Sequence, residues 1–581
     1  MAIASISPGD FTARDFDYLI VGGGTAGLAI AARLSEDPNF TVGVLEAGPA
    51  ALGENTINVP RPVLQTLGTK YDWQFETVPQ PGLDGRSLAW PRGKVLGGTS
   101  ALNLMTWNRG NKEDYDAWEK LGNKGWGWND LLPFFKKSEK IHLPDEEAEE
   151  AYQLHFDPQA VGTDGPIHIS HAKEYSKMHR LCYDTLVNMG IPENRAHQAG
   201  SNVGVWTNLN SVNPEDDTRS YASRAYYVPN SSRKNLFILT EALVQETATG
   251  VRYEHGGNPY TVSGLREIII SAGSVRSPQI LELSGVGNPQ VLEDAGIKVK
   301  VANPNVGENL QDHLLSISVF EVDSSLEKAK LEPPGTPYCY LPISTITPPG
   351  RFEELASKVR TLEENSSEKM RISKGRFNPS AKLGQFEYIF DLTNWSSDFR
   401  PEPDTNKKYA SILQILQYPF SRGNIHIQKR SNEGNRSTIS ENPIIDPGYY
   451  SGPHGELDLD VMIQGIRFAD KICRSAPLSD VVHSRVFPPS SVESDDELRD
   501  WAIKNTSTDW HPVGTCGMGG SGGIRSGVVD DRLRVYGVKR LRVADASIMP
   551  LQISAHLQAT VYAIAEKGAQ LIREDNLDRR S

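Results

Sequence analysis

With 581 residues, the chain is longer than a single hydrophobic core ordinarily supports, so we expect two or more domains. A net charge of −13 argues against nucleic acids and anionic membrane surfaces as partners. Hydrophobic content of 38% is ordinary for a globular protein, and there is no apolar stretch of about 18 residues to span a membrane. The N-terminal residues lack the apolar segment of a signal peptide, so we expect a cytoplasmic protein, or a secreted one if a leader was removed.

The cysteines lie too far apart in the sequence to form a metal-binding motif. They are Cys182, Cys339, Cys473 and Cys516. We therefore expect packed thiols, with no metal site and no disulfide framework.

The N-terminal segment is predicted to fold as a strand, a glycine turn, a helix and a second strand. Tyr18–Val21 is a short apolar run typical of a buried parallel strand. The helix is expected over Thr25–Leu34, and the second strand, Val42–Leu45, leads directly to Glu46. The turn between strand and helix carries three glycines with the spacing G-x-G-x-x-G, namely Gly22, Gly24 and Gly27.

This combination predicts a dinucleotide-binding site. Gly22 allows the tight turn, Gly24 lets backbone amides approach a pyrophosphate, and Gly27 lets the helix pack closely on the strand. The helix directs its positive N-terminal end at the phosphates. Glu46 lies about 20 residues beyond the glycines, where a carboxylate can accept hydrogen bonds from ribose hydroxyls. The motif alone does not choose between FAD and NAD.

Helical patterns recur along the rest of the chain. The predicted helices are Lys112–Leu121, Asn129–Ser138, Glu353–Lys374, Asp458–Cys473 and Thr560–Arg573. Asn129 is the expected N-cap of the second of these helices. The acidic run Asp145–Glu150 is most simply a solvated loop.

Apolar and β-branched runs predict strands, of which the third below is nearly all β-branched, as in a buried strand. The predicted strands are Pro166–Ser170, Asn235–Thr240, Glu267–Ser271, Phe386–Asp391 and Gly423–Gln428. The proline-rich segment Pro333–Pro349 is expected to be a loop.

Several longer motifs point to a known family. Gly93–Asn103 resembles the first signature of the glucose-methanol-choline (GMC) flavoprotein oxidoreductases, and Gly273–Gly287 resembles the second. Further similar motifs are Val306–His313, Val543–Ser547 and His556–Lys567. The motifs run from about residue 17 to residue 570 and occur in the family's order. A branch similar to the aryl-alcohol oxidases is one reading of the match.

The resemblance implies an α/β fold (α+β overall) with two interleaved domains. One is an FAD-binding, Rossmann-like βαβ domain, and the other is a substrate domain built on an antiparallel sheet flanked by helices. We expect the FAD-binding domain at residues 14–160, 230–320 and 520–581. The substrate-binding domain is expected at residues 161–229 and 321–519.

The resemblance also implies FAD as the cofactor. The residues implied to bind it are Gly22, Gly24, Thr25, Ala26, Gly27, Glu46, Ala47, Arg92, Gly97, Gly98, Thr99, Asn103, Leu104, Met105, Thr106, Val244, Asp545, Ala546 and Gln558. Gly97 and Gly98 lack side chains, so the backbone there can lie against a flat ring or phosphates. The alternatives are an ordinary turn at these two glycines, closed by Asn103, and a turn or N-cap aspartate at Asp545.

Some relatives attach FAD covalently through a histidine immediately before the asparagine of the first signature. Leu102 occupies that position here. Because leucine cannot form the linkage, we expect the FAD to be non-covalent.

Two histidines near the C-terminus, His511 and His556, match the family's catalytic positions. Alcohol oxidation needs a base for the hydroxyl proton while hydride passes from carbon to flavin N5, and histidine suits this because its pKa lies near neutrality. We assign His511 as the base and His556 as the second hydrogen-bonding partner, which stabilises alkoxide character. The sequence does not say which histidine holds the proton.

The other histidines are expected to be structural, including His313 in a family motif near the cofactor. Trp510 is expected either to wall the pocket or to pack in the core. Aromatic residues of the presumed substrate domain are read as ordinary sheet packing, with pocket lining as the alternative. They are Tyr340, Tyr388, Phe390 and Trp395.

The sequence therefore predicts an FAD-dependent alcohol oxidase or dehydrogenase that acts on CH–OH donors, with a role in secondary metabolism. The expected substrate is a small primary alcohol, aryl or allylic, which is converted to its aldehyde with O2 or another oxidant as electron acceptor. The alternative is an FAD-containing biosynthetic cyclase or isomerase of the same family with no net redox change, which retention of both histidines disfavours. A monomer and a homodimer both remain open.

Overall fold

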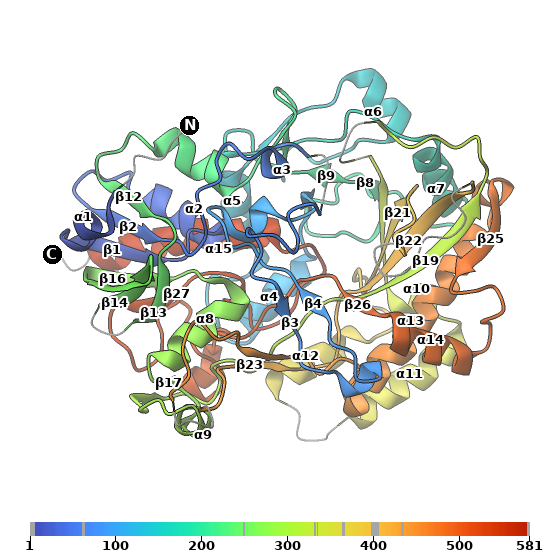
Figure 1. The fold of residues 1–581 in the computed structure, drawn as a ribbon. Helices are drawn as coiled ribbons and strands as arrows, with labels where there is room; N and C mark the ends of the chain where they lie inside the picture. Colours follow the sequence, from blue (N-terminus) through green and yellow to red (C-terminus); the bar gives the residue numbers. More distant parts are fainter. Residues whose placement is uncertain are drawn as a thin grey trace.

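The computed structural model describes residues 6–60, 64–247, 250–330, 333, 335–362, 367–396, 406–430 and 435–577. Figure 1 shows two main sheets, one toward each end of the molecule, with helices and loops between them. Within the described residues, no helix is both long enough and apolar enough to cross a membrane.

The first sheet has five parallel strands in the order β12-β2-β1-β16-β27. In that order their bounds are Leu236–Leu239, Val42–Leu45, Phe16–Val21, Gly264–Ile270 and Leu541–Val543. Helix α2 (Thr25–Leu34) packs against β1 and β2, and α15 (Gln558–Leu577) packs against α2 (Figure 1). The central strands are continuous apolar runs because a parallel sheet is covered on its faces. The predicted strand–turn–helix–strand segment is confirmed.

A small antiparallel meander follows β12 along the chain. It consists of β13 (Leu243–Thr247), β14 (Val251–His255) and β15 (Asn258–Val262). Its first strand carries Val244 to the edge of the cavity described below.

The second sheet has seven strands, and every pairing in it is antiparallel. Its strands, β26 aside, follow the order β25-β19-β22-β21-β20-β8, and β26 pairs with the start of β19. The bounds are β8 Gly204–Thr207, β19 Leu314–Val322, β20 Pro337–Leu341, β21 Phe386–Asp391, β22 Lys408–Leu416, β25 Val482–Phe487 and β26 Ser507–Thr508. The predicted α/β architecture, with a parallel and an antiparallel sheet, is confirmed.

Helices cover the antiparallel sheet on one side, as Figure 1 shows. Helix α13 (Gly452–Cys473) packs against β19 and β22, while α11 (Pro349–Thr361) and α14 (Asp495–Asn505) pack against α13. The predicted helix Asp458–Cys473 is therefore confirmed, with a start six residues earlier than expected.

The prediction of a loop at Pro333–Pro349 is wrong. Residues 337–341 form β20, a buried strand of the antiparallel sheet, and α10 (Ile343–Ile346) follows it. Pro337 is tolerated because it is the first residue of the strand, where its missing N–H costs no ladder bond. Tyr338 and Tyr340 favour the strand, since aromatic residues suit a pleated surface.

Two smaller expectations also fail. The acidic run is not a loop but helix α6 (Glu146–Tyr152), and its N-cap Asp145 accepts a hydrogen bond of 2.7 Å from the Ala148 amide. Acidic residues in a first helical turn are favourable because they face the positive end of the helix dipole. Helix α5 (Trp128–Ser138) begins before Asn129 with Gly127 as its N-cap, because an aspartate of the preceding helix binds the Trp128 amide.

The remaining predicted elements are found in the structure. Helix α4 spans Lys112–Lys120, and the predicted helix Glu353–Lys374 corresponds to α11 and α12 (Glu368–Arg376), with residues 363–366 outside the described ranges. Two predicted strands belong to small sheets rather than to a main one. They are β7 (Ile167–Ile169), which pairs with β6 (Glu139–Ile141), and β23 (Asn424–His426), which pairs with β24 (Ile444–Asp446).

The two main sheets draw their strands from different stretches of the chain. The parallel sheet uses residues 16–45, 236–270 and 541–543, whereas the antiparallel sheet uses residues 204–207 and 314–508. Strand β19 begins at Leu314, inside the stretch 230–320 that the sequence assigns to the FAD-binding domain. This strand lies in the antiparallel sheet, and the predicted domain boundaries stay predictions.

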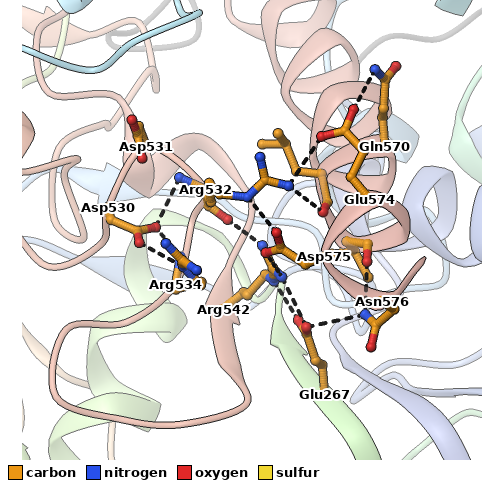
Figure 2. Close-up of polar contacts among 12 residues, drawn as sticks. Glu267, Asp530, Asp531, Arg532, Arg534, Arg542, Gln570, Glu574, Asp575 and Asn576 are labelled. Atoms are coloured by element: carbon orange, nitrogen blue, oxygen red, sulfur yellow. Dashed lines mark hydrogen bonds and ion pairs between the residues drawn. The ribbon is translucent and has the colours of Figure 1, made fainter. Parts of the chain in front are cut away.

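A network of charged side chains ties the C-terminal helix to the parallel sheet, as Figure 2 shows. Arg542 of the edge strand β27 binds Glu267 of β16 at 3.0 Å and Asp575 of α15 at 2.7 Å. Arg532 binds the other oxygen of Asp575 at 2.7 Å. Arg542 and Glu267 are fully buried, so each needs its partner to offset the cost of leaving water.

Candidate active site

A long cavity runs from the glycine turn after β1 to the two C-terminal histidines, His511 and His556. Its empty space, including the open solvent at its mouth, is about 1740 Å³. One continuous wall therefore includes both the glycine turn and the two histidines.

Most of the residues predicted to bind the cofactor lie on the wall of this cavity. They are Gly22, Gly24, Thr25, Ala26, Glu46, Ala47, Arg92, Gly98, Thr99, Asn103, Leu104, Met105, Thr106, Val244, Asp545, Ala546 and Gln558. Gly27 and Gly97 lie behind the wall, and the structure gives them a packing role instead. The binding roles themselves stay predictions.

The glycine turn can form only because its residues lack side chains. Gly22 has a φ of +101°, and a Cβ on Gly27 would lie 1.9 Å from the carbonyl oxygen of Gly22. A Cβ on Gly98, from the second loop, would lie 2.8 Å from the Cα of Gly24, so the two loops are in close contact. Helix α2 begins at Thr25 without a side-chain cap. Its first amides are thus available to an anionic group in the cavity.

Glu46 follows β2 and holds the turn from the other side. Its carboxylate accepts hydrogen bonds of 2.8 Å from the amides of Gly23 and Gly48. Burial raises the pKa of Glu46 to about 7, although these amides favour the charged form. A carboxylate at the end of this strand, on the cavity wall, can accept hydrogen bonds from ribose hydroxyls.

Asp545 connects the end of β27 to the N-terminus of α8 (Gly273–Leu283). Its carboxylate accepts hydrogen bonds from the Gly273 amide at 2.9 Å and from the Ser277 hydroxyl at 2.6 Å. It also accepts a hydrogen bond of 2.9 Å from the Ser547 amide, as an N-cap does. Asp545 lies on the cavity wall as well, so its position fits both the cofactor-binding and the N-cap interpretation.

The two candidate catalytic histidines meet at the far end of the cavity. His511 lies in the loop after β26, and His556 lies two residues before α15. Their ring centroids are 4.8 Å apart and their planes are nearly perpendicular, at 86°. The sequence placed these residues at the site, and the structure brings them together across 45 positions of the chain.

His511 is held by acidic and histidine neighbours. Its Nδ1 atom lies 3.0 Å from Nδ1 of His313 and 3.0 Å from Oδ2 of Asp509, and its amide donates to Asp312 at 2.6 Å. Burial, then the positive charge of His556, lowers the pKa of His511 well below its ordinary value. An ordinary histidine has a pKa of about 6.5, so His511 is neutral at pH 7.

His556 has the opposite electrostatic environment. Its Nε2 atom lies 3.1 Å from Oε1 of Glu387 on β21, and its amide donates to the Asn108 side chain at 3.0 Å. Burial alone would lower the pKa of His556, but the Glu387 carboxylate outweighs this effect and raises it. Gln417 donates to the other oxygen of Glu387 at 2.7 Å and keeps that carboxylate in place.

Three residues near the histidines were not foreseen in these roles. Glu387 and Asp509 were not selected as site residues, and His313 was expected to be structural. The sequence does carry a signal for Glu387, which is a charged residue within the apolar strand Phe386–Asp391. Such a residue is buried only when it has a partner. Trp510 does wall the cavity, whereas the other aromatic residues pack within the antiparallel sheet. Those residues are Tyr340, Tyr388, Phe390 and Trp395.

Comparison with known proteins agrees with this geometry. Residues 16–315 match the N-terminal model and residues 419–565 the C-terminal model of the GMC oxidoreductases. The dehydrogenase mpl7 of Monascus purpureus is 37% identical, over 99% of this chain and 98% of the relative.

Solved structures give the same result. An FAD-dependent oxidoreductase from Chaetomium thermophilum is 28% identical, with a TM-score of 0.86 over 97% of this chain and 100% of that one. Pyridoxine 4-oxidase from Mesorbium loti is also 28% identical, with a TM-score of 0.78 over 96% and 99% of the two chains. The protein is an oxidoreductase and belongs to the GMC family.

Proposed function

We propose that this protein binds FAD non-covalently and oxidises a primary alcohol, aryl or allylic, to the aldehyde. The observation that carries the proposal is the contrast between His511 and His556 at the end of the cavity that begins at the glycine turn. The pKa of His511 is lowered and that of His556 is raised, although the two rings are 4.8 Å apart. Two groups whose environments separate their pKa values in a cavity are typical of an acid–base pair.

The two histidines can hold one hydroxyl group in complementary ways. Neutral His511 accepts the hydroxyl proton, and His556, which keeps its own proton to higher pH, donates a hydrogen bond to the same oxygen. The negative charge that develops on this oxygen is stabilised by His556. FAD, when bound, supplies the acceptor for the hydride that leaves the alcohol carbon, and O2 or another oxidant then takes up the electrons.

The cavity wall fits the proposed cofactor. The open amides at the start of α2 suit the pyrophosphate, and Glu46 suits a ribose. Asn103, whose amide donates to Gln558, lies with Gly98 on the wall toward the histidines and is proposed for the flavin end. Leu102 lies on the same wall and has no atom that could bond covalently to the flavin.

The proposed substrate class rests on the chemistry of the carbon. A C–H bond next to an aromatic ring or a double bond gives up hydride more readily than one on an alkyl carbon. The paired histidines recognise a neutral hydroxyl by one acceptor and one donor, and they make no demand for a charged group on the substrate.

The test is anaerobic mixing of the FAD-loaded protein with benzyl, cinnamyl, hydroxymethylfuran, short alkyl and sugar alcohols. Fast bleaching of the flavin by the aryl or allylic alcohols supports the proposal, and a His511→Ala variant that keeps its FAD should bleach far more slowly. Fast reduction by glucose alone would overturn the substrate class. Conversion of a compound without any change in flavin absorbance would favour the cyclase or isomerase.

A further inference from the structure

A chain of hydrogen-bonding groups lies behind the proposed base. The carbonyl oxygen of Ile553 is 2.9 Å from Nε2 of His313, and Nδ1 of His313 is 3.0 Å from Nδ1 of His511. His313 is fully buried just before β19, and its ring is nearly perpendicular to that of His511, at 88°. The order of these contacts determines where each proton lies.

The first proton is set by the backbone. A carbonyl oxygen can only accept, so Nε2 of His313 carries the hydrogen that points to Ile553. Burial, then His511, keeps the pKa of His313 well below its ordinary value, and the ring is neutral. A neutral ring with its hydrogen on Nε2 offers only a lone pair at Nδ1.

The second proton follows from the first. Two Nδ1 atoms 3.0 Å apart need one hydrogen between them, and His313 has none to offer, so His511 must donate from its own Nδ1. Neutral His511 then carries no hydrogen on Nε2. Among the described residues, none forms a hydrogen bond with that Nε2 atom, and His511 lies on the cavity wall.

We propose that His313 is a positioning residue that keeps the proton of His511 on Nδ1 and so leaves the Nε2 lone pair of the base free for the substrate hydroxyl. The inference deepens the proposed function and rests on it for its kinetic consequence only. Without His313, the neutral base would be divided between two tautomers, of which one cannot accept a proton at Nε2.

Several other groups face His511 and enter the test. Asp509, from its own loop, places Oδ2 3.0 Å from the same Nδ1, and Asp312 accepts the His511 amide. His556 faces it from the loop just before α15, and Arg92, after β4 (Ala89–Trp90), acts on it through charge. The contact of Asp509 with Nδ1 is not a hydrogen bond, since Oδ2 of Asp509 has no hydrogen-bond partner among the described residues, and His313 is therefore the acceptor of the Nδ1 proton. A protonated Asp509 could donate to Nδ1 and would give the opposite tautomer.

The kinetic test compares two replacements of His313. Asparagine keeps an acceptor at the distance of Nδ1 from the backbone, whereas leucine has a similar size and no acceptor. His313→Leu should lower the rate of anaerobic flavin reduction by about 10- to 100-fold, the cost typical of a metal-binding histidine that loses the partner orienting it. The substrate KM should change little, the pH profile should move, and His313→Asn should restore most of the rate and the profile.

The matched control is His179→Leu. His179 is a buried histidine of α7 (Lys177–Asn188) that is hydrogen-bonded to Thr207 of β8 and lies away from the cavity wall. This variant should leave the rate and the pH profile unchanged. Equal behaviour of the asparagine and leucine variants of His313, or a wild-type pH profile in both, would overturn the inference.

The direct test needs neither substrate nor turnover. Nitrogen NMR of the oxidised, FAD-loaded protein with labelled histidine, assigned with His511→Asn, reports which nitrogen of His511 is protonated. We expect an unprotonated Nε2 in the wild type and in His313→Asn. A protonated Nε2 in the wild type refutes the inference even if alcohols are oxidised. The expected tautomer with no flavin reduction by any alcohol refutes the proposed function alone.

Discussion

The Nε2 atom of His556 lies 3.1 Å from the Oε1 atom of Glu387, and this pair connects the antiparallel sheet to the segment before α15. Glu387 belongs to the antiparallel sheet, while His556 precedes the helix that packs against α2. Burial would lower the pKa of His556, and Glu387 reverses the effect, whereas no such reversal occurs at His511. The division of roles between the histidines therefore depends on Glu387.

Replacing Glu387 with Gln should move the pH dependence of flavin reduction. The variant loses the negative charge, so the pKa of His556 falls and the protonated form that favours reaction is lost at lower pH. The alkaline limb of the stopped-flow reduction profile should shift to lower pH. The same linkage acts on folding: a raised pKa gives stability that is complete below about 6.5 and is lost as the pH rises through the folded pKa.

The matched control is Glu308→Gln. Glu308 lies 3.1 Å from Nε2 of His426, in a glutamate–histidine pair away from the cavity wall. The pKa of His426 is raised to about 9, against the lowering effect of burial, by Glu282 and Glu308. Glu308→Gln should lower stability below about pH 9, where His426 is charged, and leave the reduction profile as in the wild type. An unshifted alkaline limb in Glu387→Gln would show that His556 does not depend on Glu387.

The two histidines should respond differently to substitution. His511→Ala should lower the rate of flavin reduction by about 10²–10⁴-fold, the usual contribution of a general base, with FAD still bound. His556→Asn should cost less than His556→Ala, because an amide can still donate to the alcohol oxygen. Stopped-flow reduction measures all three. A near-normal rate in His511→Ala would remove it as the base, and equal rates in both His556 variants and the wild type would remove His556 from the site.

Features that neighbouring residues of the chain determine could be predicted from the sequence, whereas features that depend on contacts between distant residues could not. The helix Thr25–Leu34 and the strand Phe386–Asp391 were predicted to the residue, because turn residues and local periodicity define them. The strand Pro337–Leu341 was missed because the prolines around it indicated a loop, whereas pairing with the distant strand β21 stabilises it. Glu387 and His556 are 169 residues apart, and no local pattern reports their contact. The histidines were found through motifs, whereas the groups that set their protonation required the fold.

The cofactor should be tightly bound but not covalent. Acid precipitation should release the flavin into the supernatant, because Leu102 offers no atom for a linkage. Gly27→Ala should lower both FAD content and thermal stability, since its Cβ would lie 1.9 Å from the Gly22 oxygen. Gly53→Ala is the control, because no atom lies within 4 Å of its Cβ. Flavin that stays in the pellet would contradict the non-covalent proposal, and normal FAD content in Gly27→Ala would contradict the account of the turn.

The buried pair of Arg542 and Glu267 should matter far more for stability than an exposed pair beside it, and Figure 2 shows both. Arg542→Met leaves Glu267 without its main partner, at a cost of about 3–5 kcal/mol in the free energy of unfolding. Arg534→Met breaks an exposed pair with Asp530, 2.7 Å apart, and should cost at most about 1 kcal/mol. The measurement is the thermal unfolding midpoint of the FAD-loaded protein.

A double variant separates the loss of the ion pair from the loss of packing. The double variant combines Arg542→Met with Glu267→Leu. It leaves no buried glutamate without its ion-pair partner, so part of the lost stability should return. Asp575 also binds Arg542 and lies nearer the surface, where water can solvate it in place of the lost partner. We expect the thermal unfolding midpoints to fall, from highest to lowest, in the order wild type, Arg534→Met, double variant, Arg542→Met. A double variant less stable than Arg542→Met would mean that packing of the two side chains, rather than their charges, holds α15 to the sheet.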